Sequence, residues 1–548
     1  MLEQEKIKIT EFISSSVCSQ KKIDSSYEVI IVGSGAAGSW AAKKLTEGGK
    51  NALLLEAGDN LDIQRDFSNS GSNIFKNISA RFNQHIQMLC TAYNANPLVR
   101  KFYINDLKNP YTTSFKKPFI WIRGRQLGGR LHCWARHTPR MSDFEFKAAI
   151  YDGYGEVWPL SYDDLKPYYQ EIEKYMGLHG DFFNSEASPD GCYVASHPLN
   201  EWENNFKVAV EKNFNKSLIT SARVVEHNVY RIPRMLLDAH ATGRLTLRCN
   251  SIVTKILLNS EGNKFEGVEF IDSKTKKVYR AFGKILMVCA STIESIRLFL
   301  NSKSENHPSG LANSSGYVGK GIMDNTKFLL GGRLTTSSAS ANNFNYRVDD
   351  YDCGYANGFY IPRFQNLREK TTNYLRGFSC QGSIGRVSYK NDKLWGIVSF
   401  GEMLSYPENR VYIDLRKNDV FGIPVPRIEC SYGLNEKEML KDQIKTLYDM
   451  AKIGGLDVKL HSNWLLDKII NSIINRINLP GSSIHEVGGI RMGQKPETSV
   501  LNPYNECWDI KNIFVTDGSC FVSSGCQNPT LTIMAITVRC CKYILNKL

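Results

Sequence analysis

The sequence has no pattern that binds a metal or builds a disulfide framework. Its 548 residues include 14 cysteines, but no Cys-x-x-Cys pair and no clustered set of cysteine and histidine, and Cys540 and Cys541 are adjacent. Zinc sites and disulfide-rich domains require closer and more regular spacings. We therefore expect free thiols that fill small core positions in a reducing compartment, and no bound metal.

The sequence also lacks long apolar runs. None approaches the length of a membrane span. The first 22 residues carry three glutamates among their lysines and contain neither a signal-peptide core nor a twin arginine. These features predict a flexible leader over 1–23, no membrane span and a cytoplasmic location. Export on a partner's signal would leave no trace in this sequence.

Runs of like charge are absent as well. The net charge is +13, yet no run of five basic residues occurs. A nucleic-acid-binding protein would need a basic stripe interleaved with aromatic residues, so we expect no nucleic acid partner. The dispersed charge indicates a lysine-rich solvated surface, and the alternative is a basic face that attracts an anionic substrate or electron acceptor.

The chain is long enough for two domains. It is 42% hydrophobic and 22% charged, which is typical of a globular protein. Tyrosine and phenylalanine occur 26 times each, enough to line a large buried pocket.

A dinucleotide-binding fingerprint lies near the start. Gly33, Gly35 and Gly38 form G-x-G-x-x-G directly after the apolar run Tyr27–Val32, and an alanine-rich stretch that includes Ala36 and Ala37 follows. The first glycine permits a tight turn, the second lets the backbone approach a pyrophosphate, and the third allows close packing of helix on strand. The phosphates are expected at the N-terminus of the helix.

A second buried strand, 51–55, is followed by Glu56 and Ala57. Glu56 lies 18 residues past Gly38. Glu56 is placed to accept hydrogen bonds from ribose hydroxyls. The motif predicts a dinucleotide but does not by itself distinguish FAD from NAD.

Further segments alternate between helical and strand-like patterns. A helix is expected from 159 to 175, capped by Ser161. Three strands are expected from Arg244 to Ala290, then a helix over 291–300. Short alternating runs from 327 to 430 predict a mostly antiparallel sheet, followed by a helix over 435–453. One strand, IFVT, and a closing helix from Pro529 end the chain.

Five segments in this order resemble the glucose–methanol–choline (GMC) oxidoreductases: the glycine fingerprint, GRQLGGRLHCWARHTPR from Gly124, ASTIESIRLFLNS from Ala290, HEVGGIRMG from His485, and VTDGSCFVSSGCQNPTLTIMA from Val515. GYVGKGIMDN from Gly316 fits the same pattern. The resemblance runs from about Tyr27 to the C-terminus. It is nearest to the branch with pyranose oxidases, gluconate-type dehydrogenases and glycoside 3-oxidases.

The resemblance implies FAD as the cofactor. Glycine amides in the second segment would meet the edge of the flavin, Asp517 and Gly518 would contact the ribityl or pyrophosphate, and a helix opening at Asn528 would stabilise negative charge on the flavin. The adenine would lie against the backbone near Val253. The cofactor-binding set carried over from the family, besides the residues of the fingerprint and Glu56, is Arg125, Gly128, Gly129, Cys133, Trp134, Val253, Ala290, Asp517, Gly518, Asn528, Pro529 and Thr530.

The resemblance also places the family's catalytic pair at His485 and Asn528. Hydride transfer from a carbinol carbon needs a base for the hydroxyl proton, and histidine suits this at neutral pH. Asn528 would orient the same hydroxyl. On the residues alone, a lone histidine more often has a structural role, and it is the motif around His485 that favours catalysis.

Two positions depart from the family pattern. Some relatives attach flavin covalently through a histidine in the loop that here holds His132, Cys133 and His137; Cys133 stands at the linkage position, so we expect non-covalent FAD. Asn325 stands where many relatives have histidine, and we assign it local hydrogen bonding and no catalytic role.

The expected fold is α/β. A discontinuous, Rossmann-like FAD-binding domain would use 24–150, 220–330 and 482–548. An α+β substrate domain with a mostly antiparallel sheet would use 151–219 and 331–481.

The expected function is oxidation of a CH–OH group, of a sugar, sugar acid or glycoside, with oxygen, a quinone or a redox protein as electron acceptor. Three alternatives remain: a non-sugar alcohol from a biosynthetic pathway, a catalytically silent flavoprotein subunit, and a flavin monooxygenase or NAD(P)H-linked reductase. Many enzymes of the last kind carry a second nucleotide fingerprint, which this sequence lacks.

Overall fold

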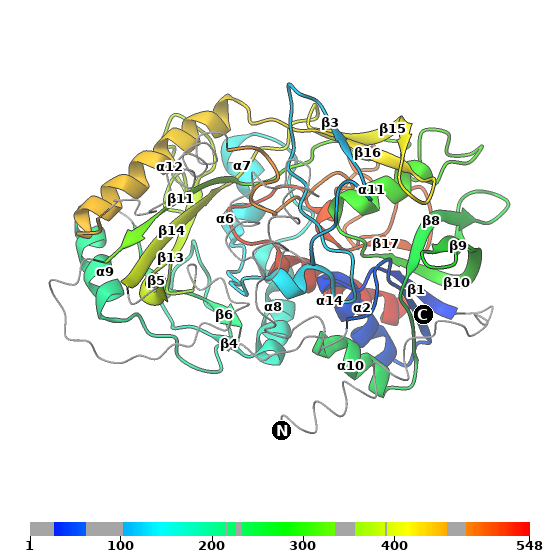
Figure 1. The fold of residues 1–548 in the computed structure, drawn as a ribbon, viewed down its shortest axis with the longest axis horizontal. Helices are drawn as coiled ribbons and strands as arrows, with labels where there is room; N and C mark the ends of the chain where they lie inside the picture. Colours follow the sequence, from blue (N-terminus) through cyan, green and yellow to red (C-terminus); the bar gives the residue numbers. More distant parts are fainter. Residues whose placement is uncertain are drawn as a thin grey trace.

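The computed structural model describes residues 27–61, 102–214, 217–225, 233–334, 357–389, 392–457 and 478–547. The predicted leader 1–23 lies outside the described residues. Figure 1 shows a parallel sheet with its helices on one side of the molecule and an antiparallel sheet beneath a long helix on the other.

The nucleotide-binding half is built on a parallel sheet in the order β7-β2-β1-β10-β17. All of β2, β1 from Val29 and β10 from Ile285 are buried, because other layers cover both faces of the sheet there. The strands are β1 (Tyr27–Val32), β2 (Ala52–Leu55), β7 (Leu245–Arg248), β10 (Val278–Val288) and β17 (Ile513–Val515). Strands from the start, middle and end of the chain thus share one sheet, as the sequence predicts.

Strand β10 belongs to two pairings. Its second half, from Gly283, pairs parallel to β1, and its first half pairs antiparallel to β9 (Phe265–Asp272). Strand β9 continues antiparallel to β8 (Ser251–Leu258). The burial of β10 changes accordingly from alternating residues to a continuous apolar run.

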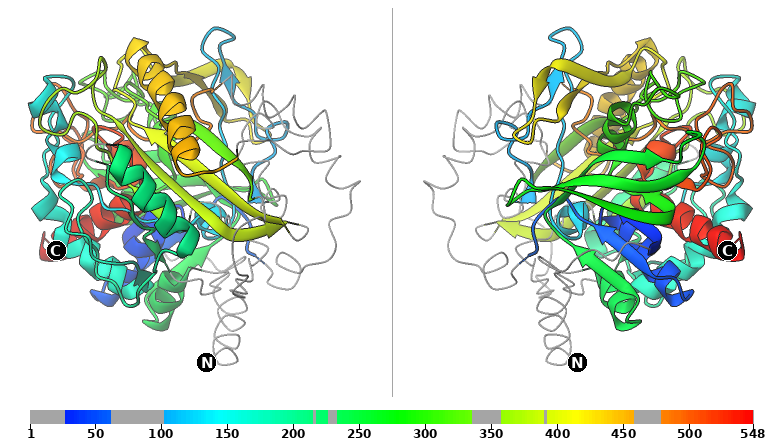
Figure 2. Two further views of the ribbon diagram at one scale, coloured as in Figure 1. Left: turned by 90° about the vertical axis from the view of Figure 1, so that its left-hand side faces the viewer. Right: turned by 90° about the vertical axis from the view of Figure 1, so that its right-hand side faces the viewer.

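Three helices pack together against this sheet: α2 (Ala36–Glu47), α10 (Arg234–Ala241) and α14 (Thr530–Lys547). Figure 2 shows α2 in blue and α14 in red side by side. Ala37, Ala41 and Ala42 are buried where α2 meets its neighbours, and such small side chains let the helices and strands approach closely. The last helix therefore anchors the segment that carries Asn528 to the nucleotide-binding turn.

The second half is a five-stranded antiparallel sheet in the order β11-β14-β13-β12-β5. Its strands are β5 (Thr220–Ser221), β11 (Thr326–Arg333), β12 (Phe359–Ile361), β13 (Phe378–Tyr389) and β14 (Asp392–Gly401). Helices α9 (Glu201–Asn213) and α12 (Leu434–Ile453) cover one face and share an apolar core with it. The gold helix in Figure 1 is α12.

A third, smaller sheet joins β15 (Arg410–Asn418), β16 (Pro424–Glu429) and β3 (Thr112–Thr113). It packs against α11 (Thr292–Asn301), the helix that follows β10. The run 410–429 therefore forms a sheet separate from the five-stranded one, a division that the alternating sequence pattern does not reveal. The boundaries of the two domains stay a prediction.

Several predicted elements are confirmed. Helix α8 (Tyr162–Met176) begins after Ser161, whose side chain accepts a hydrogen bond from the Asp164 amide in a capping box. The remaining elements are the 3-10 helices η3 (Gly129–Cys133) and η5 (Gly518–Cys520), the helices α6 (Asp143–Phe146) and α7 (Ala148–Asp152), and the strands β4 (Leu178–His179) and β6 (Val224–Val225). Among the described residues, no helix is long and apolar enough to cross a membrane.

Candidate functional site

The glycine turn between β1 and α2 leaves open space in front of a helix N-terminus. Gly33 has φ +94°, and a side chain on Gly38 would lie 1.8 Å from the Gly33 carbonyl oxygen. A side chain on Gly35, in contrast, would meet nothing within 4 Å. Helix α2 has no side-chain cap and no acidic residue in its first turn. The turn therefore offers free amides and room for an anionic group.

Glu56 stabilises this turn from the end of β2. Its carboxylate accepts hydrogen bonds from the amide and hydroxyl of Ser34, at 3.0 and 2.5 Å, and from the Gly58 amide at 2.7 Å. Burial raises the pKa of Glu56. These bonds use part of the capacity of the carboxylate, and a ribose hydroxyl would have to share it.

The other predicted cofactor segments converge on the same turn. The Gly128 amide donates to the Ser34 hydroxyl at 2.9 Å, and a side chain on Gly129 would lie 3.3 Å from Gly35 Cα. Ala290 Cα would lie 3.1 Å from a side chain on Gly33. Four segments that are distant in sequence thus meet at this turn.

The segments of Val253 and Asp517 are connected to the glycine turn through hydrogen bonds of nearby residues. The amide of Ser251, two residues before Val253, donates to the Glu56 carbonyl oxygen at 2.8 Å. The Asp517 carboxylate accepts bonds from the Ser519 amide and the Ser295 hydroxyl, so it caps η5 and holds α11. Burial raises the pKa of Asp517.

Other predicted cofactor residues have structural partners. Arg125 donates to Asn109 Oδ1 at 2.6 Å and to Glu294 Oε1 at 3.1 Å. Cys133 packs against a small apolar cluster, and Trp134 against the main core. Whether these three contact a cofactor stays a prediction.

His485 and Asn528 are brought together from segments 43 residues apart. Asn528 Nδ2 lies 3.2 Å from His485 Nε2. Asn528 is followed by Pro529 and then by Thr530, the first residue of α14, so it stands at the N-terminus of the closing helix. That helix has no acidic residue in its first turn, which leaves its N-terminal dipole unopposed.

Asn325 is the residue whose importance the sequence prediction missed. Its Oδ1 lies 2.9 Å from His485 Nδ1, while its Nδ2 donates to the carbonyl oxygens of Gly401 and Gly525 at 3.0 and 2.8 Å. Because the amide nitrogen is committed to two carbonyls, Oδ1 must face the imidazole. Nδ1 of His485 therefore carries the proton, and Nε2 is left as a bare acceptor.

Asp324 holds the segment that presents His485. Its fully buried carboxylate accepts hydrogen bonds from the amides of Gly481, Ser483 and His485 at 2.7, 3.2 and 3.0 Å. Burial, with repulsion from Glu486, raises the pKa of Asp324 to about 6. The adjacent pair Asp324–Asn325 thus fixes both the backbone and the ring of His485.

The surroundings keep His485 neutral. Burial, together with the nearby cations Lys327 and Arg130, lowers the pKa of His485 to about 3. Arg130 also donates to the Ile484 carbonyl oxygen and pairs with Glu486, which ties the Gly128–Gly129 loop to the histidine segment. A neutral imidazole with a bare Nε2 is in the state that can accept a proton.

A second histidine completes a line of polar side chains. His137 Nδ1 lies 3.2 Å from Asn528 Oδ1. Since Asn528 Nδ2 faces His485, Asn528 Oδ1 must accept from His137, so its Nδ1 carries the proton. Burial lowers the pKa of His137 to about 4. The sequence flagged His137 as part of a possible flavin-linkage loop, but not as a partner of Asn528.

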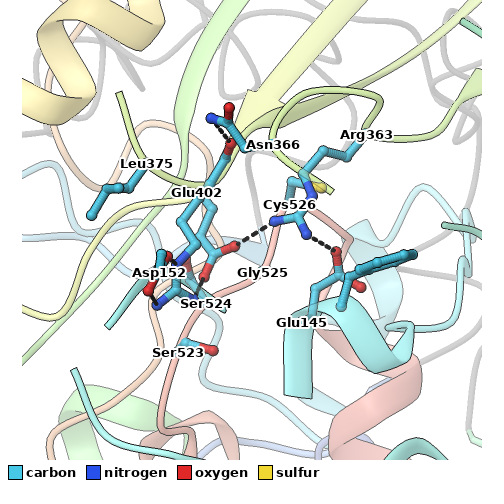
Figure 3. A network of polar contacts seen from close by, with 12 residues as sticks. Glu145, Asp152, Arg363, Asn366, Leu375, Glu402, Ser523, Ser524, Gly525 and Cys526 are labelled. Carbon is cyan, nitrogen blue, oxygen red and sulfur yellow. Dashed lines mark hydrogen bonds and ion pairs between the residues drawn. The ribbon is translucent and has the colours of Figure 1, made fainter. Parts of the chain in front are cut away.

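The loop before Asn528 rests on a buried ionic network. Arg363 lies between Glu145 and Glu402, and Arg376 joins Glu402 to Asp152 (Figure 3). Figure 3 also shows residues 523–526 alongside these groups. Burial raises the pKa of Glu402, and the two arginines oppose that shift. Such a network fixes local geometry, because removing one partner would leave an uncompensated buried charge.

Comparison with known proteins agrees with this assembly. A family model described as "GMC oxidoreductase" matches residues 407–537, and one described as "FAD binding domain" matches residues 28–98, of which 62–98 lie outside the described residues. The 2-methyl-1,2-propanediol dehydrogenase of Mycolicibacterium austroafricanum is 26% identical, over 95% of both chains.

The fructose dehydrogenase large subunit of Gluconobacter japonicus is 25% identical, over 95% of this chain and 98% of its own. The chain carries a GMC oxidoreductase domain in residues 407–537 and is similar over almost its whole length to these two dehydrogenases. It is an FAD-dependent oxidoreductase.

A solved structure of formate oxidase from Aspergillus oryzae RIB40 superposes with a TM-score of 0.66, at 14% identity, and covers 96% of this chain and 99% of its own. At that identity the likeness shows a shared fold. The predicted α/β fold class is thereby confirmed.

Proposed function

We propose that this GMC oxidoreductase oxidises the CH–OH group of a polyhydroxylated small molecule, such as a sugar, sugar acid or glycoside, with His485 as the base. The observation that carries the proposal is the bare Nε2 of a neutral, buried His485 beside Asn528. Full-length relatives named for a propanediol and for fructose support a hydroxyl-bearing substrate.

In this reaction the protein residues handle the substrate and its proton. Bound FAD supplies the acceptor for the hydride. Asn528 Nδ2 donates to the substrate oxygen, and Nε2 of His485 takes the hydroxyl proton. Asn325 Oδ1 then stabilises the imidazolium through Nδ1–H. Burial makes a standing imidazolium costly, so we expect the proton to move as the hydride leaves carbon.

FAD binding is proposed to be non-covalent. Cys133 occupies the position where some relatives carry the linking histidine. His132 Nε2 lies 2.7 Å from the Leu127 carbonyl oxygen, and His137 Nδ1 faces Asn528, so both histidines of this loop are held by local hydrogen bonds. Acid precipitation should release the yellow cofactor into the supernatant, and flavin retained in the washed precipitate would contradict this.

The direct test of the function is a substrate screen on the purified holoenzyme. Sugars, sugar acids, glycosides and simple alcohols are added without oxygen, and loss of flavin absorbance is recorded. Bleaching by polyhydroxylated compounds supports the proposal. If none of these compounds reduces the flavin, while dithionite does, the proposed function is wrong.

The cellular location and the electron acceptor are proposals of the same kind. We propose a cytoplasmic enzyme whose electrons pass to oxygen, a quinone or a redox protein. Reoxidation of the reduced enzyme by air, by a soluble quinone analogue and by cytochrome c, compared at equal concentrations, would identify the class of acceptor.

A further inference from the structure

One face of the five-stranded sheet is turned toward the two histidines. Phe400 on β14 packs on His485, with ring centroids 4.9 Å apart, and Tyr360 on β12 packs on His137 at 5.2 Å. Gln381 on β13 pairs directly with Tyr360. It is two residues from Ser379, which pairs with Phe400.

Strand alternation places these side chains on one face. Residues that pair across antiparallel strands point to the same side, and so do residues two apart on one strand. Asn528 contacts His485 on one side and His137 on the other. Gln381 therefore lies between Phe400, which packs on His485, and Tyr360, which packs on His137. The opposite face carries Phe328, Ile397 and their neighbours, which pack beneath α9 and α12.

Three polar atoms in this region lack a hydrogen bond of good geometry among the described residues: His137 Nε2, Tyr360 Oη and Gln381 Oε1. The Tyr360 hydroxyl has the Ser379 side chain close by, which partly offsets the rise that burial causes in its pKa. Their side chains are 0%, 1% and 4% exposed. Buried polar groups are rarely left unpaired, because each one costs the free energy of its lost hydration. Three of them in adjacent residues, next to the catalytic pair, point to a molecule that supplies the missing partners.

The chemistry of the three atoms restricts that molecule. His137 Nε2 is a bare acceptor, since its Nδ1 proton is given to Asn528, and Gln381 Oε1 is also an acceptor. Tyr360 Oη can donate or accept. Two bare acceptors disfavour a carboxylate or phosphate here and suit the hydrogens of hydroxyl groups.

We propose that His137, Tyr360 and Gln381 form a hydroxyl-binding subsite. It recognises at least one further hydroxyl of the substrate, close to the carbinol that is oxidised at His485, and so selects diols and sugars over monohydric alcohols. This inference rests on the proposed function, because it takes His485 and Asn528 as the place of oxidation.

The test compares each hydroxylated compound with an analogue that lacks one hydroxyl. Two pairs are used with the holoenzyme: 2-methyl-1,2-propanediol with 2-methyl-1-propanol, and D-glucose with 2-deoxy-D-glucose. Anaerobic flavin reduction is measured for wild type, Tyr360→Phe and Gln381→Leu. In the wild type the compound with the additional hydroxyl should react faster. Each substitution should reduce that preference by about tenfold.

Stability gives a second readout that a merely structural role would not produce. Tyr360→Phe removes only the unpaired hydroxyl, so it should leave thermal stability unchanged or raise it. Tyr374→Phe is the matched control. Tyr374 is equally buried in the same half of the protein, but its hydroxyl donates to Asp442 at 2.6 Å. Tyr374→Phe should lower the melting temperature and leave the preference for the additional hydroxyl unchanged.

The outcomes separate this subsite from the function itself. If the wild type reduces its flavin as fast with the monohydric or deoxy analogues, or if both variants keep the wild-type preference, the subsite is contradicted and the proposed function stands. A Tyr360→Phe variant that loses stability as Tyr374→Phe does would also contradict it. If no alcohol reduces the flavin, the proposed function fails, and with it the basis of this inference.

Discussion

Nδ1 of His485 lies 2.9 Å from Oδ1 of Asn325, whose amide nitrogen is held by the carbonyl oxygens of Gly401 and Gly525. A neutral side-chain amide thus determines which imidazole nitrogen is protonated. The bare Nε2 points toward Asn528, which binds it at 3.2 Å. If His485 is the base, as we propose, its tautomer is set before the substrate binds, by a residue that need not touch the substrate.

The first prediction concerns this positioning residue. Asn325→Leu removes the acceptor from Nδ1, so the imidazole can adopt either tautomer. We expect anaerobic flavin reduction to slow by roughly 5- to 150-fold, equivalent to about 1–3 kcal/mol for an unmade buried hydrogen bond. The affinity for substrate should change little, so the loss should appear in the limiting rate.

Asn409→Leu is the control for this variant. Asn409 is also fully buried, and its amide donates to the Ser431 carbonyl oxygen and accepts from the Ser431 amide. It should lose stability to a similar degree without a change in flavin reduction. Equal rate losses in both variants would show that Asn325 acts only through general stability.

The second prediction concerns the nucleotide turn. A methyl group at Gly35 meets no protein atom within 4 Å, so the Gly35→Ala apoprotein should be as stable as wild type. FAD affinity should nevertheless fall at least tenfold, because the methyl group occupies space that the pyrophosphate needs. Titration of apoprotein with FAD, followed by flavin fluorescence, measures this.

Gly38→Ala gives the contrasting case. Its methyl group would lie 1.8 Å from the Gly33 carbonyl oxygen, so this apoprotein should itself be destabilised. Unchanged FAD affinity in Gly35→Ala would mean that the pyrophosphate lies elsewhere.

Only part of this site could be predicted from the sequence. The glycine spacing, Glu56 and the C-terminal motifs are local patterns. They predicted the cofactor and, through the family resemblance, the pair His485 and Asn528. Several strands of the parallel sheet also followed from buried apolar runs. Each of these features is formed by residues that are close together in the sequence, so the sequence alone is enough to recognise it.

The contacts of Asn325, His137 and Tyr360 depend instead on how distant segments fold together. Asn325 lies 160 residues from His485, and His137 lies 391 residues from Asn528. Nothing in the local spacing of an asparagine or a histidine distinguishes such a pairing from an ordinary buried hydrogen bond. For the same reason the separate sheet of β15, β16 and β3 could not be predicted from alternation alone.

The third prediction concerns acid stability. The folded pKa of His137 is about 4 and that of His485 about 3, below the usual value of 6.5. A depressed folded pKa means that the unfolded chain binds protons first as pH falls. The stabilising contribution is therefore present above pH 6.5 and is lost between about pH 6.5 and 4.

The size of this pH dependence follows from the number of protons that the unfolded chain binds in excess of the folded protein. Each histidine contributes up to about 1.4 kcal/mol per pH unit in that window, so the pair contributes up to about 3 kcal/mol per unit. Urea unfolding of wild type and His137→Gln between pH 7 and 4.5 measures this. The variant should show a shallower pH dependence, and identical slopes would contradict a buried neutral His137.

The central claim is that His485 takes the substrate's hydroxyl proton. It is tested most directly by single-turnover, anaerobic reduction of the flavin, so that the electron acceptor has no influence. His485→Ala should bind FAD as wild type does and reduce it about 10²- to 10⁴-fold more slowly.

Asn528→Ala should be milder, losing about 1–3 kcal/mol of transition-state stabilisation, because Asn528 orients the alcohol without taking its proton. A His485→Ala enzyme with bound FAD that is reduced by substrate at the wild-type rate would contradict the account.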